Sequence, residues 1–158
     1  IDAASAQLVA TIPLPDAEPY GLAISADGRA LYASDALGDR LFVINTATRQ
    51  VATTVPVGLH PALIARAPDG KTLYVANGGS HSVSVVSIAP NPLAPAVVGA
   101  AVQVDGYPHG IAITPDGRYV VVANTYGQNL SVIDTATLRV VATIPAEKYP
   151  SNVLITPG

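Results

Sequence analysis

Apolar residues in this chain occur in short runs that are separated by polar turns. Segments such as Leu73–Ala76 and Tyr119–Ala123 end at Gly, Pro, Asn or Asp. No segment carries apolar residues at positions i, i+3, i+4 and i+7 over the roughly ten residues that identify a helix. Short apolar runs bounded by turn residues are typical of strands. The pattern therefore predicts an all-β chain.

The same order of segments recurs along the chain. A proline that opens an apolar run recurs at Pro19, Pro61, Pro108 and Pro150, at intervals of 42, 47 and 42 residues. An Asp-Gly pair follows each of the first three prolines, and this pair between two apolar runs is typical of a hairpin, because Gly adopts the positive φ of a tight turn. The five extra residues of the second interval fall in 89–95, where three prolines mark a loop insertion.

Four short antiparallel strands that recur about every 40–45 residues are typical of β-propeller blades. We name the strands of a blade A to D, from the innermost to the outermost. In blade 1 we expect them at 21–25, 30–34, 40–44 and 50–56. The expected partial propeller is one domain, with blades at about 19–57, 61–104 and 108–146, a lone strand D at 7–13 and a lone strand A at 151–156.

Several phrases of the sequence closely resemble the YVTN β-propeller repeat. They include Leu73-Tyr74-Val75-Ala76-Asn77, Pro115-Asp116-Gly117-Arg118 and Ser131-Val132-Ile133-Asp134-Thr135-Ala136-Thr137. The resemblance implies a relationship to exported and surface-layer proteins, to lactonase-like hydrolases and to the propeller parts of periplasmic redox enzymes. It also implies a ring of about seven blades. We therefore expect this chain to be part of a longer polypeptide, or to complete its propeller with other copies or other chains.

Composition excludes several classes of protein. The chain has 158 residues, 49% of them hydrophobic, with no Cys, a net charge of −3 and a pI near 5.4. The absence of Cys excludes disulfides and Cys-based metal sites, and the charge argues against nucleic-acid binding through a basic surface. No run approaches the roughly 20 apolar residues that a membrane helix needs. No cofactor is predicted.

The candidate ligand-binding residues gather at one face of the expected propeller, where the D–A and B–C loops lie. His60 and His109 adjoin the repeat prolines, and His81 lies in a B–C loop. The other candidates lie in the same two kinds of loop, and they are Glu18, Tyr20, Tyr107 and Tyr126. The formal charge of this face is −4, against +2 for the opposite face. Solvated loop histidines are the simpler interpretation of the pattern.

No preformed metal site is visible in the sequence. The candidates for a metal ligand, if one binds, are Glu18, His60 and His109, and Glu18 with His60 could instead form an acid–base pair across neighbouring blades. Arg66 is the least expected residue, because Ile24, Ile113 and Ile155 occupy the equivalent positions. Either its head reaches solvent at the basic face, or it meets a carboxylate, a carbonyl or an anionic ligand.

Two functions are compatible with these observations. The first, which we favour at this stage, is a non-catalytic propeller module that serves as a scaffold or as a protein- or ligand-binding surface in an exported or cell-surface protein. The alternative is a segment of a propeller enzyme, hydrolytic or redox, with its ligand at the acidic, histidine-bearing mouth. No Gly-rich phosphate loop, Gly-x-Ser-x-Gly elbow or His-Glu-x-x-His motif occurs, so no catalytic residue is assigned.

Overall fold

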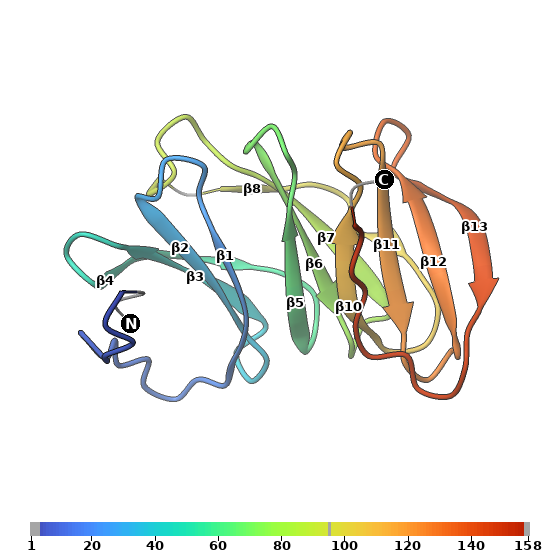
Figure 1. The fold of residues 1–158 in the computed structure, drawn as a ribbon, viewed down its shortest axis with the longest axis horizontal. Coiled ribbons are helices and arrows are strands. Elements are labelled where there is room, and N and C mark those ends of the chain that lie inside the picture. Colours follow the sequence, from blue (N-terminus) through green and yellow to red (C-terminus); the bar gives the residue numbers. More distant parts are fainter. Residues whose placement is uncertain (1–3, 95, 157–158) are drawn as a thin grey trace.

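The computed structural model describes residues 4–94 and 96–156, and within them all regular structure is β-strand. Each strand pairs antiparallel with its neighbours, which gives three sheets (Figure 1). The first sheet holds β1 (Pro19–Ile24), β2 (Ala30–Asp35), β3 (Arg40–Asn45) and β4 (Gln50–Pro56). The second holds β5 (Pro61–Arg66), β6 (Thr72–Asn77), β7 (Ser82–Ser87), β8 (Val97–Val98) and β9 (Val102–Gln103). The third holds β10 (Pro108–Ile113), β11 (Tyr119–Asn124), β12 (Asn129–Asp134) and β13 (Arg139–Pro145). The predicted all-β architecture of propeller blades is confirmed.

The Asp-Gly pairs form the turns between the first and second strands of each blade. Gly28, Gly70 and Gly117 have φ values of 73°, 72° and 73°, in the left-handed region that Gly adopts without steric cost. The aspartate that precedes each glycine accepts the backbone N–H two residues further on, as Asp27 does from Arg29 at 3.1 Å. This local hydrogen bonding explains why the turns are readable in the sequence.

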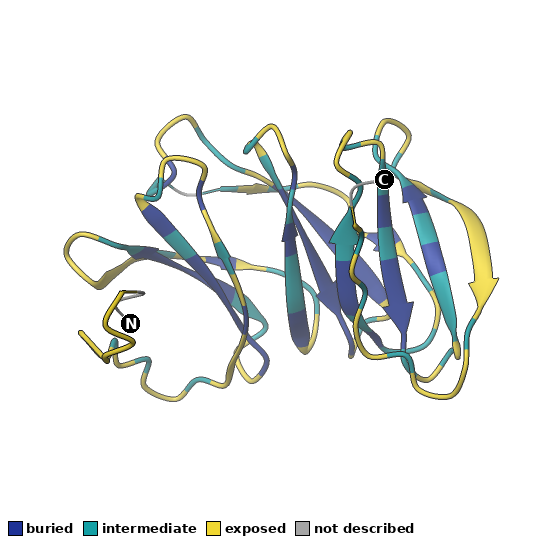
Figure 2. Ribbon diagram, viewed as in Figure 1, coloured by how far each residue is buried: buried dark blue, intermediate teal, exposed yellow. Residues whose placement is uncertain are grey.

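The core lies between the blades, because the sheets pack face to face. Tyr32, Leu41 and Val43 of blade 1 pack against Leu73 and Val75 of blade 2. A second cluster joins blades 2 and 3 and includes Tyr74, Val83, Ile111, Val120 and Ile133. Figure 2 shows the buried residues on the central strands, whereas β13 is largely exposed. Each fully buried Val, Leu or Ile contributes about 1.5–3 kcal/mol, so neighbouring blades stabilise one another.

The innermost strands β1, β5 and β10 lie side by side, and a glycine allows this close approach. A Cβ atom on Gly21 would lie 2.5 Å from the Ala62 carbonyl oxygen. The Ser34 hydroxyl reinforces this contact, since it donates to the Ala62 carbonyl at 2.6 Å and accepts the Gly21 N–H at 2.7 Å. A Cβ on Gly110 would meet Asn152 Cα at 2.6 Å in the same way. Residues 151–152 therefore occupy the place that an innermost strand takes beside β10.

The two lone strands expected at 7–13 and 151–156 are not strands in the structure. An outermost strand pairs with the third strand of its own blade and an innermost strand with the second, and the described residues hold no such partner for either segment. A strand that lacks this ladder has no regular hydrogen-bonding pattern. The outer strand of blade 2 is also divided, because β8 and β9 pair separately with β7. The expected insertion precedes β8, and its Pro95 lies outside the described residues.

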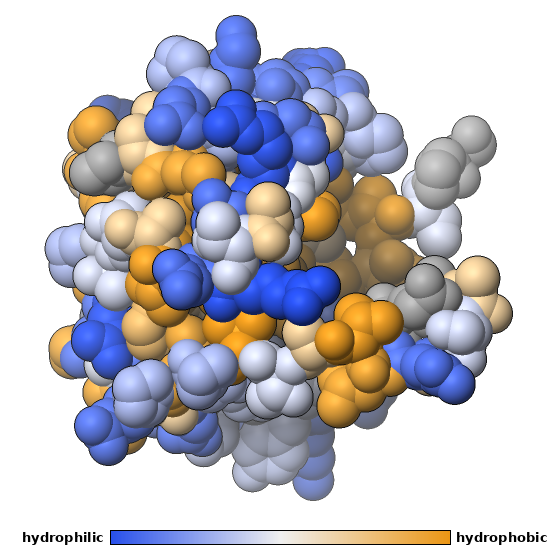
Figure 3. Space-filling view, turned by 90° about the vertical axis from the view of Figure 1, so that its left-hand side faces the viewer, coloured by the Kyte–Doolittle hydropathy of each residue, from blue (hydrophilic) through white to orange (hydrophobic). Residues whose placement is uncertain are grey.

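The first blade leaves an apolar face open. Leu22 is 63% exposed, whereas Ile111, the equivalent residue of blade 3, is 6% exposed because blade 2 covers it. Figure 3 shows apolar patches on this side of the molecule. The surface that blades use to pack against one another is thus partly uncovered at blade 1. None of the described segments forms a helix long and apolar enough to cross a membrane.

Candidate functional site

The residues predicted as candidate ligands, apart from Arg66, lie at the end of the strands where the D–A and B–C loops meet. We call this end the mouth face, and the opposite end, with the A–B and C–D turns, the turn face. Tyr20 and His109 lie near the starts of innermost strands β1 and β10, and Tyr107 lies just before β10. Tyr126 lies in the loop between β11 and β12, and it is 63% exposed.

His109 is held by groups from two distant parts of the chain. Its Nδ1 lies 2.8 Å from the Ser151 carbonyl oxygen and its Nε2 lies 2.8 Å from the Tyr20 hydroxyl. Because a carbonyl oxygen only accepts, Nδ1 carries the proton, and in the neutral ring Nε2 accepts from Tyr20. The Tyr20 and His109 rings meet edge to face, with centroids 5.1 Å apart. Residues of blade 1, blade 3 and the C-terminal segment therefore fix one ring tautomer.

A second group of rings extends across the mouth face from blade 2. The Tyr107 hydroxyl lies 3.4 Å from Nδ1 of His60. The Tyr107 ring lies 4.8 Å from that of Tyr126, and Tyr126 lies 6.4 Å from Tyr149 at an interplanar angle of 86°. The sequence places these residues in neighbouring loops, and the structure adds that they form one continuous aromatic surface.

The suggested pairing of Glu18 with His60 is not present. The side chain of His60 meets Tyr107 of the next blade, and among the described residues no ion pair joins it to the Glu18 carboxylate. Within residues 4–94 and 96–156, no three His, Asp or Glu side chains gather as a metal site. Glu18, His60 and His109 therefore do not form a ligand set in this arrangement.

His81 has a structural contact that the sequence analysis did not foresee. Its Nδ1 accepts the backbone N–H of Tyr107 at 2.9 Å, and Asp39 Oδ1 accepts that of His60 at 2.8 Å. Asp39 and His81 end the B–C loops of successive blades, and all four residues have positive φ values between 51° and 56°. We call each of these contacts a blade joint. A non-glycine residue with positive φ is uncommon, and here the hydrogen bonds of the blade joints stabilise this backbone conformation.

Three acidic side chains of the mouth face, Asp35, Asp39 and Asp105, already accept hydrogen bonds from the loops. Asp35 is fully buried and meets Arg40 Nε at 2.9 Å. Burial alone raises the pKa of Asp35, but hydrogen bonds from the Glu18 N–H, Arg40 and the Gly38 N–H outweigh it, so its pKa lies below the ordinary value. The pKa of Asp105 is lowered by the Asn129 amide and the Gly106 N–H. These carboxylates stabilise the loops.

Two buried amide oxygens near the mouth face have no hydrogen-bond partner in the part of the chain that the structure describes. They are Oδ1 of Asn77 and of Asn124, the last residues of β6 and β11, and both side chains are fully buried. Their amide nitrogens are satisfied, since that of Asn77 donates to Ser82 and Ser84. The repeated Ala-Asn ending in the sequence signals the position. The pattern does not reveal that the amide oxygen lacks a hydrogen bond, because both carboxylate oxygens of Asp35, at the equivalent position of blade 1, accept hydrogen bonds.

Arg66 lies away from the other candidates, at the turn face. Its Nη1 is 3.4 Å from the Ala67 carbonyl oxygen, and the residue is only partly buried. Two hollows lie at this face between successive blades, of about 330 Å³ and 300 Å³. The first lies beside the Pro-rich insertion, and sequence reasoning missed it because it depends on how the insertion folds back over the blade. Its lining consists of Ser25, Ala26, Asp27, Gly70, Lys71, Ile88, Ala89, Pro90 and Pro92.

Comparison with known proteins agrees with the propeller fold. The family described as "Lactonase, 7-bladed beta-propeller" matches residues 41–144. Hydrazine synthase of Kuenenia stuttgartiensis is similar, with 29% identity, a TM-score of 0.75 and coverage of 92% of this chain and 41% of that chain. No curated protein matches. The specific YVTN repeat assignment stays a prediction.

Two structures titled putative 6-phosphogluconolactonases share the fold, each at 21% identity. The protein from Bacteroides fragilis has a TM-score of 0.76, with coverage of 87% of this chain and 42% of that chain. The protein from Bacteroides uniformis has a TM-score of 0.77, with coverage of 93% and 48%. This chain spans less than half the length of these similar structures.

Proposed function

The chain belongs to the lactonase family of seven-bladed β-propellers, and from this premise we propose that it forms part of a propeller enzyme that hydrolyses a lactone at the mouth face. The observation that carries the proposal is the environment of His109. Its ring is oriented by the Ser151 carbonyl, and its Nε2 accepts a hydrogen bond from Tyr20. A histidine that a third group holds in one tautomer is suited to accept and return a proton near neutral pH.

The residues have distinct roles in this proposal. Substrate entry separates the Tyr20 hydroxyl from Nε2, and a water molecule takes its place. The water oxygen attacks the lactone carbonyl carbon while its proton passes to His109 Nε2. Tyr20 donates a hydrogen bond to the carbonyl oxygen, on which negative charge develops. The ring C–O bond then breaks, and the leaving oxygen takes the proton back from His109, so the product is a hydroxy acid.

In this proposal the exposed aromatic surface binds the substrate. Tyr107 and Tyr126 offer ring area beside His60 and close to the entry to β10. Aromatic rings provide contact area with little loss of side-chain freedom and end in a polar tip. A hydroxylated lactone ring can stack on such a surface while its hydroxyl groups bond to the tyrosines.

A non-catalytic binding module remains the second candidate. The engagement of Asp35, Asp39 and Asp105 in loop hydrogen bonds favours it, because these carboxylates are not free to take part in acid–base chemistry. In that case the surface of Tyr107, Tyr126 and Tyr149 would bind a protein or glycan partner without turnover. Export to the periplasm, the cell surface or the medium belongs to both proposals, and fractionation of the producing cells tests it.

The deciding experiment measures lactone hydrolysis by the full natural chain. Proton release from glucono-δ-lactone, 6-phosphogluconolactone and γ-butyrolactone is followed with a pH indicator. We expect His109→Gln to lower kcat/KM by about 10²–10⁴-fold, and Tyr20→Phe to lower it less. Tyr119→Phe is the matched control, because Tyr119 opens β11 at the turn face, away from the proposed site, and it should retain activity. A folded protein that accelerates none of these reactions would overturn the enzyme proposal in favour of the module.

A further inference from the structure

The hollow between blades 1 and 2 differs from its counterpart in ways that bear on binding. Both lie at the turn face, next to an Asp-Gly turn of each blade. The counterpart between blades 2 and 3 includes the two carboxylates of Asp69 and Asp116. The first hollow has one carboxylate, that of Asp27, together with the cationic Lys71 and the apolar wall of the insertion. The hollow between blades 2 and 3 therefore serves as an internal reference for the hollow between blades 1 and 2.

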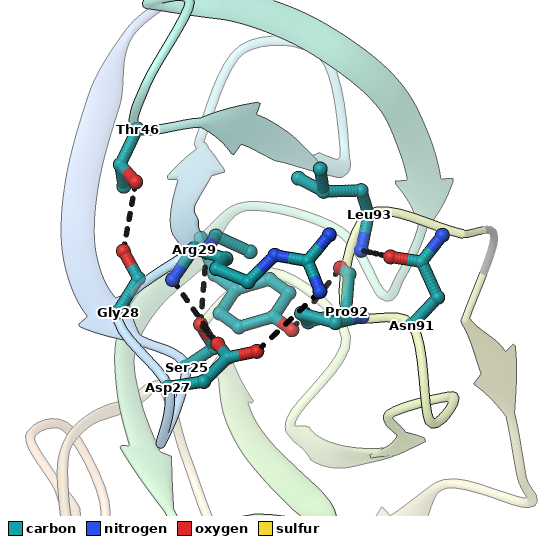
Figure 4. Close-up of polar contacts among 10 residues, drawn as sticks. Ser25, Asp27, Gly28, Arg29, Thr46, Asn91, Pro92 and Leu93 are labelled. Atoms are coloured by element: carbon teal, nitrogen blue, oxygen red, sulfur yellow. Dashed lines mark hydrogen bonds and ion pairs between the residues drawn. The ribbon is translucent and has the colours of Figure 1, made fainter.

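The apolar wall is a formed structure. Asn91 Oδ1 accepts the Leu93 N–H at 3.3 Å, and the Asn91 carbonyl accepts the Ala94 N–H at 3.0 Å, so the insertion holds its own turn. Ile88 and Leu93 pack against the core that joins blades 1 and 2. The buried Tyr32 hydroxyl lies 3.4 Å from the Pro92 carbonyl. Figure 4 shows Pro92 facing Asp27 and Arg29 of the blade 1 turn.

The two opposite charges in the lining of the hollow, Asp27 and Lys71, are not paired with each other. Asp27 is occupied, because its Oδ1 accepts from the Ser25 hydroxyl at 2.7 Å and its Oδ2 lies 4.0 Å from Arg29 (Figure 4). Among the described residues, no carboxylate lies within 4 Å of the Lys71 ammonium or the Arg66 guanidinium. Arg66 is not part of the lining, but its Nη1 lies 3.4 Å from the position that a Cβ on Gly70 would take, and Gly70 lines the hollow.

We propose that this hollow binds a small organic carboxylate with a compact hydrocarbon or aromatic body. Lys71 holds the carboxylate, Arg66 supports it from behind Gly70, and Ile88, Pro90 and Pro92 cover the body. A hydrogen bond between charged groups is about twice as strong as a neutral one, and a volume of about 330 Å³ lies within the range of small-molecule sites, about 300–1,000 Å³. The site is at the opposite end of the strands from His109, so it does not depend on the proposed hydrolysis.

The apolar wall, formed by Ile88, Ala89, Pro90 and Pro92, restricts the class of ligand that fits the hollow. An inorganic anion would satisfy Lys71 and Arg66 but would leave the surfaces of Ile88, Ala89 and Pro90 uncovered. A neutral apolar molecule would cover those surfaces and leave the two cations without a carboxylate partner among the described residues. Only a ligand that combines both features matches Lys71 and the apolar residues of the lining together. Because that lining comes from two blades, such a ligand would also strengthen the contact between blades 1 and 2.

Calorimetric titration of the full natural chain with benzoate tests the proposal. We expect saturable binding, with benzyl alcohol and sulfate each at least tenfold weaker. Lys71→Gln should weaken benzoate binding about tenfold, which corresponds to about 1.4 kcal/mol. Lys148→Gln is the matched control, because it removes the same charge at the mouth face and should change nothing. Arg66→Ile, which restores the residue type of the equivalent positions, should weaken binding while the protein stays folded.

Other outcomes would overturn the proposal. They are sulfate binding as tight as benzoate binding, a loss of affinity in Lys148→Gln equal to that in Lys71→Gln, and a titration that does not saturate by about 20 mM benzoate. If Lys71→Gln proves unstable, Ala89→Asp places a negative charge in the lining and should abolish benzoate binding. His109→Gln should leave benzoate binding intact, so failure of this proposal and failure of the proposed hydrolysis are distinguished.

Discussion

His81 accepts the backbone N–H of Tyr107 through Nδ1 at 2.9 Å, and this contact joins a loop of blade 2 to the residue that enters blade 3. Asp39 makes the same contact with His60 one blade earlier, at 2.8 Å. Two chemically different side chains thus perform one task at equivalent places in the repeat. A histidine at a propeller mouth can therefore be structural, even where it is grouped with candidates for catalysis.

The first prediction concerns this joint. His81→Ala removes the acceptor and places Ala at a positive φ, so we expect the free energy of unfolding to fall by about 1–2 kcal/mol. His81→Asp copies the residue that blade 1 uses, and should stay within about 0.5 kcal/mol of the wild type. Urea denaturation of both variants measures the difference. Equal destabilisation by the two substitutions would contradict a hydrogen-bonding role.

The second prediction tests the placement of residues 151–152 beside β10. A Cβ on Gly110 would lie 2.6 Å from Asn152 Cα, which is backbone and cannot turn aside. We expect Gly110→Ala to destabilise the protein by about 1–3 kcal/mol, the usual cost of overpacking. Gly99→Ala is the control, because its nearest neighbour would be 3.6 Å away. Thermal unfolding should separate the two variants, and a tolerated Gly110→Ala would mean that the C-terminal segment lies elsewhere.

The third prediction concerns the ion pair between the buried Asp35 and the partly exposed Arg40. Asp35→Asn leaves Arg40 without its partner, and we expect a loss of about 2 kcal/mol at neutral pH. The double change Asp35→Asn with Arg40→Ser recreates the residues of blade 2, Asn77 and Ser82, and should recover much of that loss. Guanidinium denaturation provides the comparison. If the double variant is no more stable than Asp35→Asn, the unpaired arginine is not the cause.

The same pair predicts a pH dependence with a definite sign. The folded-state pKa of Asp35 lies below the ordinary value of 3.8, so the folded state favours the charged carboxylate. Its contribution to stability is complete above the ordinary pKa and is lost as the pH falls through the folded-state pKa. We expect the wild type to lose more stability than Asp35→Asn between about pH 5 and pH 2. Parallel acid-denaturation curves for the two proteins would contradict this assignment.

The fourth prediction concerns the open face of blade 1. Leu22 is 63% exposed where its counterpart Ile111 is buried between blades, and exposed interblade surfaces favour association. We expect residues 1–158 produced by themselves to associate through this face, with other copies or other propeller segments as the partners. Light scattering should give a mass above 16.0 kDa, and Leu22→Lys should lower it. A stable, soluble monomer of 16.0 kDa would contradict the prediction.

The features that could be predicted from the sequence are those that depend on residues close together in the chain. The strands of blade 1 lie within two residues of their expected bounds, because Asp-Gly turns are determined by neighbouring residues. The segments 7–13 and 151–156 have strand-like sequences, yet a strand also needs a paired neighbour. The contact of His109 with Tyr20 joins residues 89 apart, and the hollow beside Pro92 depends on the folded insertion. Such long-range relationships have no signal in a single sequence.

The blade joints have a consequence for how such a protein is assembled and altered. Each joint uses the end of one B–C loop to position the residue just before the first strand of the next blade. The repeat unit that contains one whole joint therefore runs from one Asp-Gly turn to the next, and it is offset by one strand from the visible sheet. Duplication of a whole repeat copies one complete joint and leaves both neighbours intact. Breaks in the chain, circular permutations and inserted domains should therefore be accommodated at Gly28 or Gly117, where no joint is cut.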